Sequence, residues 1–388
     1  MKQQKIAYLG KNELTDVDLS YLHSAQKLSD ITYILEINPR LKNGPAINFP
    51  EVAPRTGVFK ALELYPQLKS FDGFIDLEKF YVVNSYGRLW FLRSLLAYTS
   101  LLFFLIRQKF SLIHLVWPPQ LYEFPVYFLR KRMMMTVHDP FPHEDESHDT
   151  LIVRLRRWFA FHLIPKFIIL NKAQREKFLD FYQLKGENVY DSKLGSYDYM
   201  QTLHTVSPTP SEQGYILFVG KISQYKGVEY LLEAMEQVHE QFPQQKLIVA
   251  GGGKFHFDIE PYKQKDYIEF RNRFIHNDEL ASLIRNSAFL VCPYTNATQS
   301  GVIMSAYAFC KPVIATTVGG LPEMLGNGKL GPLVPPKDSE ALAKAMCKLL
   351  GDKESQKNYS ENISLVYREG ELSWKEIARK LSDIYKQL

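Results

Sequence analysis

The sequence predicts an α/β protein with two domains, each a parallel β-sheet covered by helices. The chain of 388 residues is long enough for two or three domains of ordinary size. Short apolar runs of strand length alternate with helical patterns in both halves, which is typical of buried parallel sheets. Between them lies a polar stretch with two prolines, 207–214, which cannot pack a core. We therefore expect domains over 1–205 and 206–365, and a C-terminal helix over 366–388.

In the first half, continuous apolar runs predict strands at 6–9, 31–37, 112–116, 133–137 and 167–170. Helical patterns occupy 20–28 and 89–106. In the second half we expect strands at 215–219, 246–250, 268–270, 288–292 and 312–316, and helices at 228–242, 279–286, 300–308 and 339–350. In the last stretch, 374–385, apolar residues recur at the spacing of one packed helix face. Both halves therefore have a Rossmann-like pattern.

Composition limits the class of protein. Apolar residues make up 46% and charged residues 23%, so we expect a folded globular protein. The net charge of +5 is too small for a dedicated nucleic-acid binder. The three cysteines show neither a CxxC pair nor metal spacing, and the N-terminus lacks the pattern of a signal peptide. These observations favour a reducing, cytoplasmic location.

One segment raises the possibility of membrane contact. Residues 94–106 are thirteen uncharged residues, within a stretch, 88–138, that holds seven Lys/Arg and one acid, Glu123. Thirteen helical residues span about 20 Å, which is too short to cross a bilayer. Two interpretations remain open: a helix buried against the sheet, or a partly exposed helix resting on an anionic membrane surface, with Arg93, Arg107, Lys109 and 130–132 as its basic flank.

A turn between a predicted strand and helix could bind phosphate. The strand ends at Gly220, Lys221 and Lys226 follow, and a helix begins near residue 227. A helix N-terminus with two ammonium groups suits a diphosphate, although lysines at a turn are commonly just solvated. Gly252, in a run of three glycines after the next strand, is a weaker signal.

Two further helix starts follow in the second half, at Ser300–Gly301 and at 319–323. Each would offer free backbone N–H groups to an anion. The alternative is two well-capped helices, with Glu323 complementing the dipole of its own helix.

Six ordered motifs carry a resemblance to a known family. They are VGKISQYKG, LIVAGGG, DELASLIRNSAFLVCPY, ATQSGV with AYAFCKPVIATTVGGLPE, GPLVPPKDSEALAKAM, and SWKEIARKL. Together they resemble the family-4 glycosyltransferases of the GT-B class. The resemblance implies two facing Rossmann-like domains, with a last helix that packs back on the N-terminal domain. It also implies a UDP- or GDP-linked sugar donor held by the C-terminal domain, and metal-independent transfer with retention of configuration.

The resemblance also assigns roles to residues. Lys221, where the family usually has arginine, and Lys226 would face the donor diphosphate and stabilise the leaving nucleoside diphosphate. The donor site would further include the residues that match the family's glycine and loop positions, namely Gly220, Gly252, Ser300, Gly301, Val302 and Glu323.

The sequence departs from the family at a pair of glutamates. Ala297 and Ser305 occupy their positions, so both carboxylates are missing. The ATQSGV loop resembles a subgroup linked to surface-polysaccharide synthesis, in which Thr298 and Gln299 would contact the sugar. The sequence therefore does not identify the sugar of the donor.

In the first domain, His138 follows a strand and resembles the family's histidine beside the reacting sugar, where it would stabilise charge or position the acceptor hydroxyl. Two patterns could suggest a metal. The first, Asp16-Val17-Asp18, suits the dipole of a following helix, and the second, 143–148, reads as an acidic loop in water. We expect no metal and no other cofactor.

The sequence thus predicts a retaining glycosyltransferase that transfers a sugar to a lipid-linked saccharide acceptor. This reaction would belong to surface-polysaccharide or glycoconjugate synthesis. The protein would be cytoplasmic, peripheral on the inner face of the cell membrane, and would not bind nucleic acid. Two alternatives remain. A GT-B epimerase would act without an acceptor, and a non-catalytic sugar-nucleotide-binding protein would bind the donor without turnover.

Overall fold

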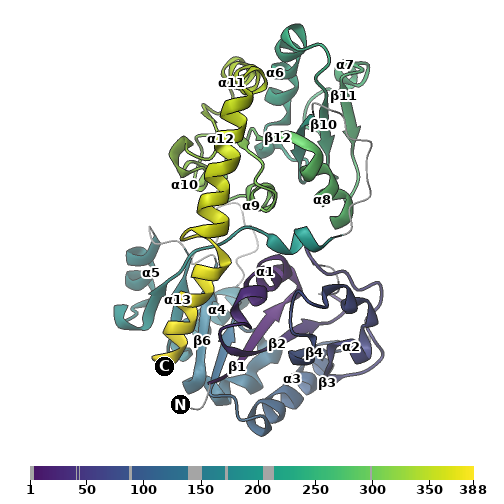
Figure 1. The fold of residues 1–388 in the computed structure, drawn as a ribbon. Helices are drawn as coiled ribbons and strands as arrows, with labels where there is room; N and C mark the ends of the chain where they lie inside the picture. Colours follow the sequence, from purple (N-terminus) through teal and green to yellow (C-terminus); the bar gives the residue numbers. More distant parts are fainter. Residues whose placement is uncertain are drawn as a thin grey trace. The chain divides into compact units, whose positions relative to one another are not determined.

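A computed structural model describes residues 4–40, 42, 44–86, 90–138, 151–170, 174–203, 214–297 and 299–388 (Figure 1). Contacts divide the chain into two compact units, described separately below. Unit 1 comprises Met1–Gly195 with Trp374–Leu388, and unit 2 comprises Ser196–Ser373. From the sequence, the first boundary was expected later, after residue 205, and the second earlier, after residue 365. Of the expected linker, 207–214, only Gly214 lies within the described residues.

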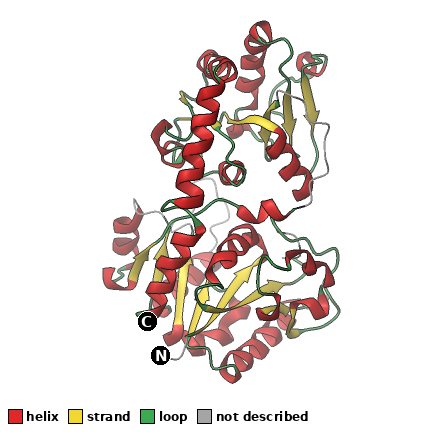
Figure 2. Cartoon of the chain, viewed as in Figure 1, coloured by secondary structure: helices red, strands yellow, loops and turns green. Residues whose placement is uncertain are grey.

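Unit 1 contains a sheet in the order β3-β4-β2-β1-β5-β6-β7-β8, in which only β3 runs antiparallel. From β4 to β7 this is the doubly wound order, with its switch point between β1 and β5. Figure 2 shows the strands in yellow. The strands are β1 (Lys5–Lys11), β2 (Asp30–Ile37), β3 (Gly57–Lys60), β4 (Phe80–Asn84), β5 (Leu112–Leu115), β6 (Met133–Val137), β7 (Phe167–Ile169) and β8 (Val189–Asp191). Strands β3, β4 and β8 were not predicted from the sequence, and β3 and β8 lie at the edges of the sheet.

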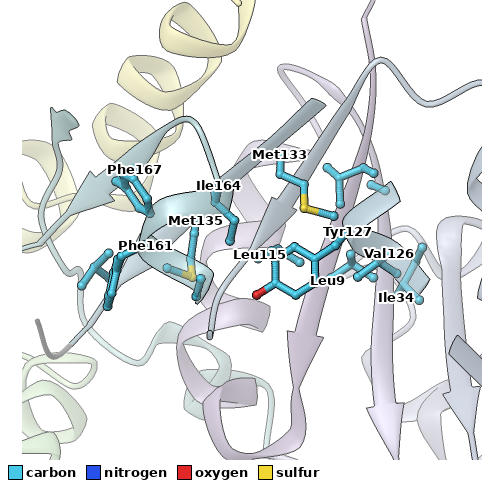
Figure 3. Close-up of a cluster of buried hydrophobic side chains, with 14 of the residues drawn as sticks. Leu9, Ile34, Leu115, Val126, Tyr127, Met133, Met135, Phe161, Ile164 and Phe167 are labelled. Carbon is cyan, nitrogen blue, oxygen red and sulfur yellow. The ribbon is translucent and has the colours of Figure 1, made fainter. Parts of the chain in front are cut away.

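The helices of unit 1 cover the sheet on both faces, because successive strand residues point to opposite sides. Met133 and Met135 belong to a core cluster that also includes residues of α3 (Trp90–Arg107), the 3-10 segment Leu121–Arg132, α4 (Leu151–Leu163) and α5 (Arg175–Tyr182) (Figure 3). Thr136 and His114 point to the other face, which α1 (Thr15–Ala25) and α13 (Trp374–Lys386) cover. Both predicted helices of this half exist, although α1 begins at Thr15 rather than at residue 20.

Helix α13 packs against α1 through a buried apolar face that includes Trp374 and Leu381. Hydrogen bonds add to this packing. The Tyr385 hydroxyl lies 2.8 Å from the Tyr21 hydroxyl and 2.6 Å from Nδ1 of His114. Burial lowers the pKa of His114 to about 3, so the imidazole is neutral at pH 7. The last helix is thus an integral part of unit 1.

Unit 2 has the sheet order β11-β10-β9-β12-β13-β14, with every pair parallel. Its strands are β9 (Tyr215–Val219), β10 (Leu247–Ala250), β11 (Ile268–Arg271), β12 (Ser287–Cys292), β13 (Val313–Thr316) and β14 (Leu333–Val334). Its helices are α6 (Val228–Gln241), α7 (Glu260–Lys263), α8 (Asn277–Asn286), α9 (Gly301–Tyr307), α10 (Leu321–Met324), α11 (Ser339–Gly351) and α12 (Lys353–Ser364). All strands and helices predicted for this half are present, and the prediction of two Rossmann-like α/β domains is confirmed.

Candidate functional site

The candidate site of unit 2 lies at the switch point of its sheet, between β9 and β12. In doubly wound sheets, ligands bind beyond the carboxyl ends of the strands at this point. Two loops leave the sheet here: 220–227, which joins β9 to α6, and 293–300, which joins β12 to α9.

The two loops are held against each other by backbone contacts. The N–H of Thr295 donates to the carbonyl of Tyr225 at 2.8 Å. Gly227 has a φ of +60°, and a Cβ on it would lie 2.1 Å from the carbonyl oxygen of Pro293. Only glycine permits both the left-handed conformation and this close approach. The start of α6 is therefore fixed beside the end of β12.

Lys226 belongs to the first loop, and its ammonium group lies against aromatic rings from both loops. Its Nζ is 3.6 Å from the ring centroid of Tyr294 and 5.0 Å from that of Tyr225. The side chain is half-buried, and this burial lowers the pKa of its ammonium group. None of the ion pairs formed within the described part of the chain includes Lys226. The structure thus holds a partly desolvated cation against aromatic faces at the N-terminus of a helix.

The remaining residues of the first loop differ from Lys226 in exposure. Lys221 is exposed, so its ammonium group is solvated in this structure. Gly220 lies at the end of β9, where a Cβ would come 3.5 Å from a methyl of Val302 on α9. The hydroxyl of Ser223, which the sequence analysis did not single out, is buried and lacks a hydrogen-bond partner among the described residues.

Gly252 follows β10, and its carbonyl accepts from the N–H of Ile222 at 3.0 Å. The neighbouring Gly251 has a φ of +145°, and a Cβ there would lie 2.0 Å from the carbonyl oxygen of Gly220. The glycine run therefore allows the turn after β10 to approach the turn after β9. This close approach requires a glycine at position 251 but not at Gly252, where a Cβ would have room.

The second loop ends at Ser300, the residue before α9. Its hydroxyl lies 3.2 Å from the Tyr294 hydroxyl, so one aromatic residue contacts both this serine and Lys226. Ser305 donates to the carbonyl of Gly301 at 2.9 Å and is buried. Gln299 is exposed, and Thr298 lies outside the described residues.

Glu323 is exposed in the first turn of α10, which follows β13, one strand farther from the switch point. This position suits the dipole of its own helix. The other predicted donor residues that the structure describes belong to the loops after β9, β10 and β12 or to α9, which follows the last of these loops. Tyr225 and Tyr294 were missed as site residues, although both lie inside motifs quoted from the sequence.

His138 belongs to unit 1 and lies at the carboxyl end of β6. It lines a small cavity of that unit together with Tyr21, Ser192 and Trp374. Burial lowers the pKa of His138 to about 4, so at pH 7 its imidazole is neutral and can accept a proton or a hydrogen bond. It follows the strand that carries Thr136, whose hydroxyl lies 2.7 Å from Nε2 of His114.

The switch point of unit 1 holds a buried charged cluster that the sequence analysis did not predict. Lys11, the last residue of β1, forms ion pairs with Glu123 and, at 3.1 Å, with Glu36. Glu36 also accepts hydrogen bonds from the Tyr98 hydroxyl at 3.0 Å and from the Asn38 amide at 2.9 Å. In the sequence, the only sign of this cluster is a charged residue at or near the end of an apolar strand, Lys11 in β1 and Glu36 in β2.

The two patterns that could suggest a metal have different outcomes. Asp18 is buried in α1 and accepts hydrogen bonds from the hydroxyls of Tyr8, at 3.0 Å, and Tyr33, at 3.1 Å. Burial raises the pKa of Asp18, which fits a structural role. The acidic loop, 143–148, lies outside the described residues. Within the described ranges, no group of three or more His, Cys, Asp or Glu side chains could hold a metal ion.

Comparisons with known proteins agree with this geometry. Residues 213–352 match the family model of glycosyl transferases group 1. An uncharacterized glycosyltransferase of Methanocaldococcus jannaschii, MJ1178, is 33% identical over 175 residues, which cover 44% of this chain and 48% of that protein. The D-inositol 3-phosphate glycosyltransferase of Corynebacterium efficiens is 28% identical over 187 residues, covering 46% of this chain and 44% of the relative. The chain thus spans less than half the length of these two relatives.

Among solved structures, Anabaena Alr3699/HepE in complex with UDP shares the fold with a TM-score of 0.65, over 99% of this chain and 100% of that one, at 16% identity. This likeness extends the common fold to both units. The resemblance of the second half to glycosyltransferases is confirmed for 213–352, the region that contains both loops of the switch point.

Proposed function

We propose that this protein is a retaining, metal-independent glycosyltransferase that transfers a sugar from a UDP- or GDP-linked donor to a lipid-linked saccharide, in surface-polysaccharide or glycoconjugate synthesis. Three findings support the transfer reaction. Residues 213–352 match glycosyl transferases group 1, both relatives described above are named as glycosyltransferases, and HepE was solved with UDP.

The observation that carries the proposal is the environment of Lys226. A half-buried ammonium group without an acidic partner among the described residues is unfavourable, because burial has removed water that no carboxylate replaces. A diphosphate would supply the missing negative charge. It would lie at the N-terminus of α6, where free N–H groups and the helix dipole also favour an anion.

Lys226 would act mainly on the leaving group. When the bond to the sugar breaks, negative charge grows on the nucleoside diphosphate, and a fixed cation beside it stabilises that charge. Lys221 would turn from solvent toward the same phosphates. The first N–H groups of α9, at Gly301 and Val302, would contact them through the backbone.

Ser305 would replace the family's carboxylate beside the ribose. Its hydroxyl already donates a hydrogen bond to the carbonyl of Gly301, so it can only accept a hydrogen bond from a ribose hydroxyl. A carboxylate offers more acceptor positions and a charge, and we therefore expect weaker ribose binding than a glutamate would give. Gln299 and Thr298 would contact the sugar.

His138, as a neutral imidazole, would accept a hydrogen bond from the acceptor hydroxyl or position that hydroxyl. In a front-face reaction with retention, the departing phosphate can take the proton, so His138 need not be the base.

The test compares nucleotide binding and turnover of Lys226→Ala with those of Lys348→Ala, an exposed lysine of α11 in the same unit. We expect UDP or GDP to raise the melting temperature of the wild type. Lys226→Ala should weaken that binding by about 10- to 100-fold, the usual worth of a hydrogen bond to a charged group. Lys348→Ala should behave as wild type. Wild-type affinity and turnover in Lys226→Ala would refute the diphosphate assignment.

The same assay separates the two alternatives. An epimerase would consume the donor sugar without any added acceptor. A non-catalytic binding protein would be stabilised by the nucleotide and would show no turnover with any acceptor.

A further inference from the structure

One face of unit 1 exposes large apolar side chains on three neighbouring elements: α3, the 3-10 segment Leu121–Arg132 and α4, of which the segment contacts both helices. We call this the apolar face. Its most prominent members are 47–73% exposed and are Leu96, Phe103, Phe124, Phe128, Leu155 and Trp158. Side chains of this size are seldom exposed together on a soluble protein without a binding role.

These side chains are not needed for the core. The same elements pack on the sheet through a separate set of buried residues, which includes Leu101 of α3, Val126 of the 3-10 segment and Phe161 of α4. Helix α3 is therefore apolar on its outer side as well as on its inner side. One side of this helix is buried, as the first interpretation expected, and the other is exposed, while contact of the exposed side with a membrane stays a prediction.

The charge of this region has one sign. The described residues of 90–138 and 151–170 include ten Lys/Arg and a single acid, Glu123. Glu123 is buried and pairs with Lys11, so it does not contribute to the surface. Several of the basic side chains are exposed where α3 and the 3-10 segment end, namely Arg107, Lys109, Arg130, Lys131 and Arg132.

We propose that the apolar face binds the surface of a lipid bilayer that carries anionic headgroups. Apolar and aromatic side chains would enter the boundary between headgroups and acyl chains, while the basic residues beside them would contact lipid phosphates and carboxylates. Among the described residues, no helix is long and apolar enough to cross a membrane. The face would therefore lie on the bilayer.

A second copy of the chain fits this face less well. In a twofold interface each face meets its own equivalent, so the basic residues would meet basic residues. No exposed acid within the described parts of this region could compensate them. An anionic surface satisfies both the apolar and the charged side chains.

The test is flotation of the full chain with phosphatidylcholine vesicles, with and without about 30% phosphatidylglycerol, at physiological salt. We expect binding to the anionic vesicles only. The double variant Leu96→Gln/Phe103→Gln should lower partitioning by at least about tenfold, because it removes two apolar side chains from the contact. Leu365→Gln provides the matched control, since Leu365 is 56% exposed in unit 2.

A second pair of variants tests the charge. Arg130→Glu/Lys131→Glu should abolish flotation with anionic vesicles, whereas Lys353→Glu/Lys357→Glu in unit 2 should not. All four positions are exposed, so unchanged circular dichroism is expected for each variant.

Three results would overturn the proposal: no flotation of the wild type with anionic vesicles, equal flotation of wild type and the Leu96/Phe103 variant, or equal flotation with neutral vesicles. Wild-type self-association that the Leu96/Phe103 variant abolishes, without vesicle binding, would assign the face to a second copy. Flotation needs no donor or turnover, so its outcome is independent of the proposed transfer reaction.

Discussion

The buried cluster around Lys11 allows a quantitative prediction for the substitution Lys11→Met. Lys11 is 5% exposed and is the ion-pair partner of both Glu36 and Glu123. Methionine keeps most of the volume of the lysine stem, so the change removes the charge without leaving a large cavity. Two buried carboxylates would then lack their cation.

Removing one partner of a buried ion pair costs about 3–5 kcal/mol, because the remaining carboxylates either stay charged without compensation or must take up a proton. For a unit of this size the urea dependence of the unfolding free energy is about 3 kcal/mol per M. The midpoint of unfolding should therefore fall by about 1–2 M urea. A matched control is Lys79→Met, whose partner Asp30 lies 3.0 Å away at the surface of the same unit. Surface pairs contribute at most about 1 kcal/mol.

Tryptophan fluorescence is a specific probe for this experiment. The four tryptophans of the chain, at positions 90, 117, 158 and 374, all belong to unit 1. Their emission therefore reports the unfolding of unit 1 without a contribution from unit 2. Lys11→Met should shift this transition, whereas Lys79→Met should leave it nearly unchanged.

A midpoint shift of Lys11→Met below about 0.3 M would refute the reasoning, since it corresponds to less than 1 kcal/mol. The double variant Lys11→Met/Glu123→Gln gives a second check. Because it removes one of the two uncompensated charges, it should regain part of the lost stability. A double variant that is less stable than Lys11→Met would show that Glu123 stabilises the unit by some other contact.

Two further predictions concern single residues. Gly227→Ala should weaken nucleotide binding more than Gly328→Ala, because both glycines have positive φ but only a Cβ at 227 meets a neighbouring atom, the Pro293 carbonyl oxygen. Calorimetric titration with UDP and GDP measures this, and equal affinities in the two variants would contradict it. Burial and the nearby Glu36 raise the pKa of Glu123 to about 7, against the opposing effect of Lys11, so the folded unit binds this proton more tightly than the unfolded chain does. Its stability should therefore fall as the pH rises from 5 to 8, with a smaller slope in Glu123→Gln, as measured by urea unfolding in that range; equal slopes would exclude Glu123 as the titrating group.

The sequence predicted unit 2 better than unit 1 for a physical reason. Strands β9 and β10 are short apolar runs that are each followed by a glycine, and α6 between them has a clear apolar stripe. In unit 1, α3 was predicted and α4 was not, although both helices carry apolar residues on their exposed side as well as on their buried side. The unpredicted edge strands β3 and β8 are short and each ends in a charged residue, so they lack the continuous apolar run by which buried strands are predicted.

The candidate site residues also differ in how far they could be predicted. Lys226 could be found because its strand, turn and helix are contiguous in the chain. The environment of Lys226 depends on Tyr294, and that of Lys11 on Glu123, residues that lie far away in the sequence. Pattern analysis of local segments cannot detect such pairs, because only the sheet topology brings them together.

The attachment of α13 to unit 1 bears on the order in which the chain can fold during synthesis. The face of the first sheet that holds Tyr8 and His114 is covered in part by a helix that the ribosome makes only after all of residues 196–373. Until then, this face would expose aromatic rings and the hydrogen-bonding nitrogen of His114 that Tyr385 later contacts. Unit 2, continuous in sequence, has no such delay. The domain made first would therefore be the last to reach its final structure, and nascent chains would depend on protection of that face while the second half is translated.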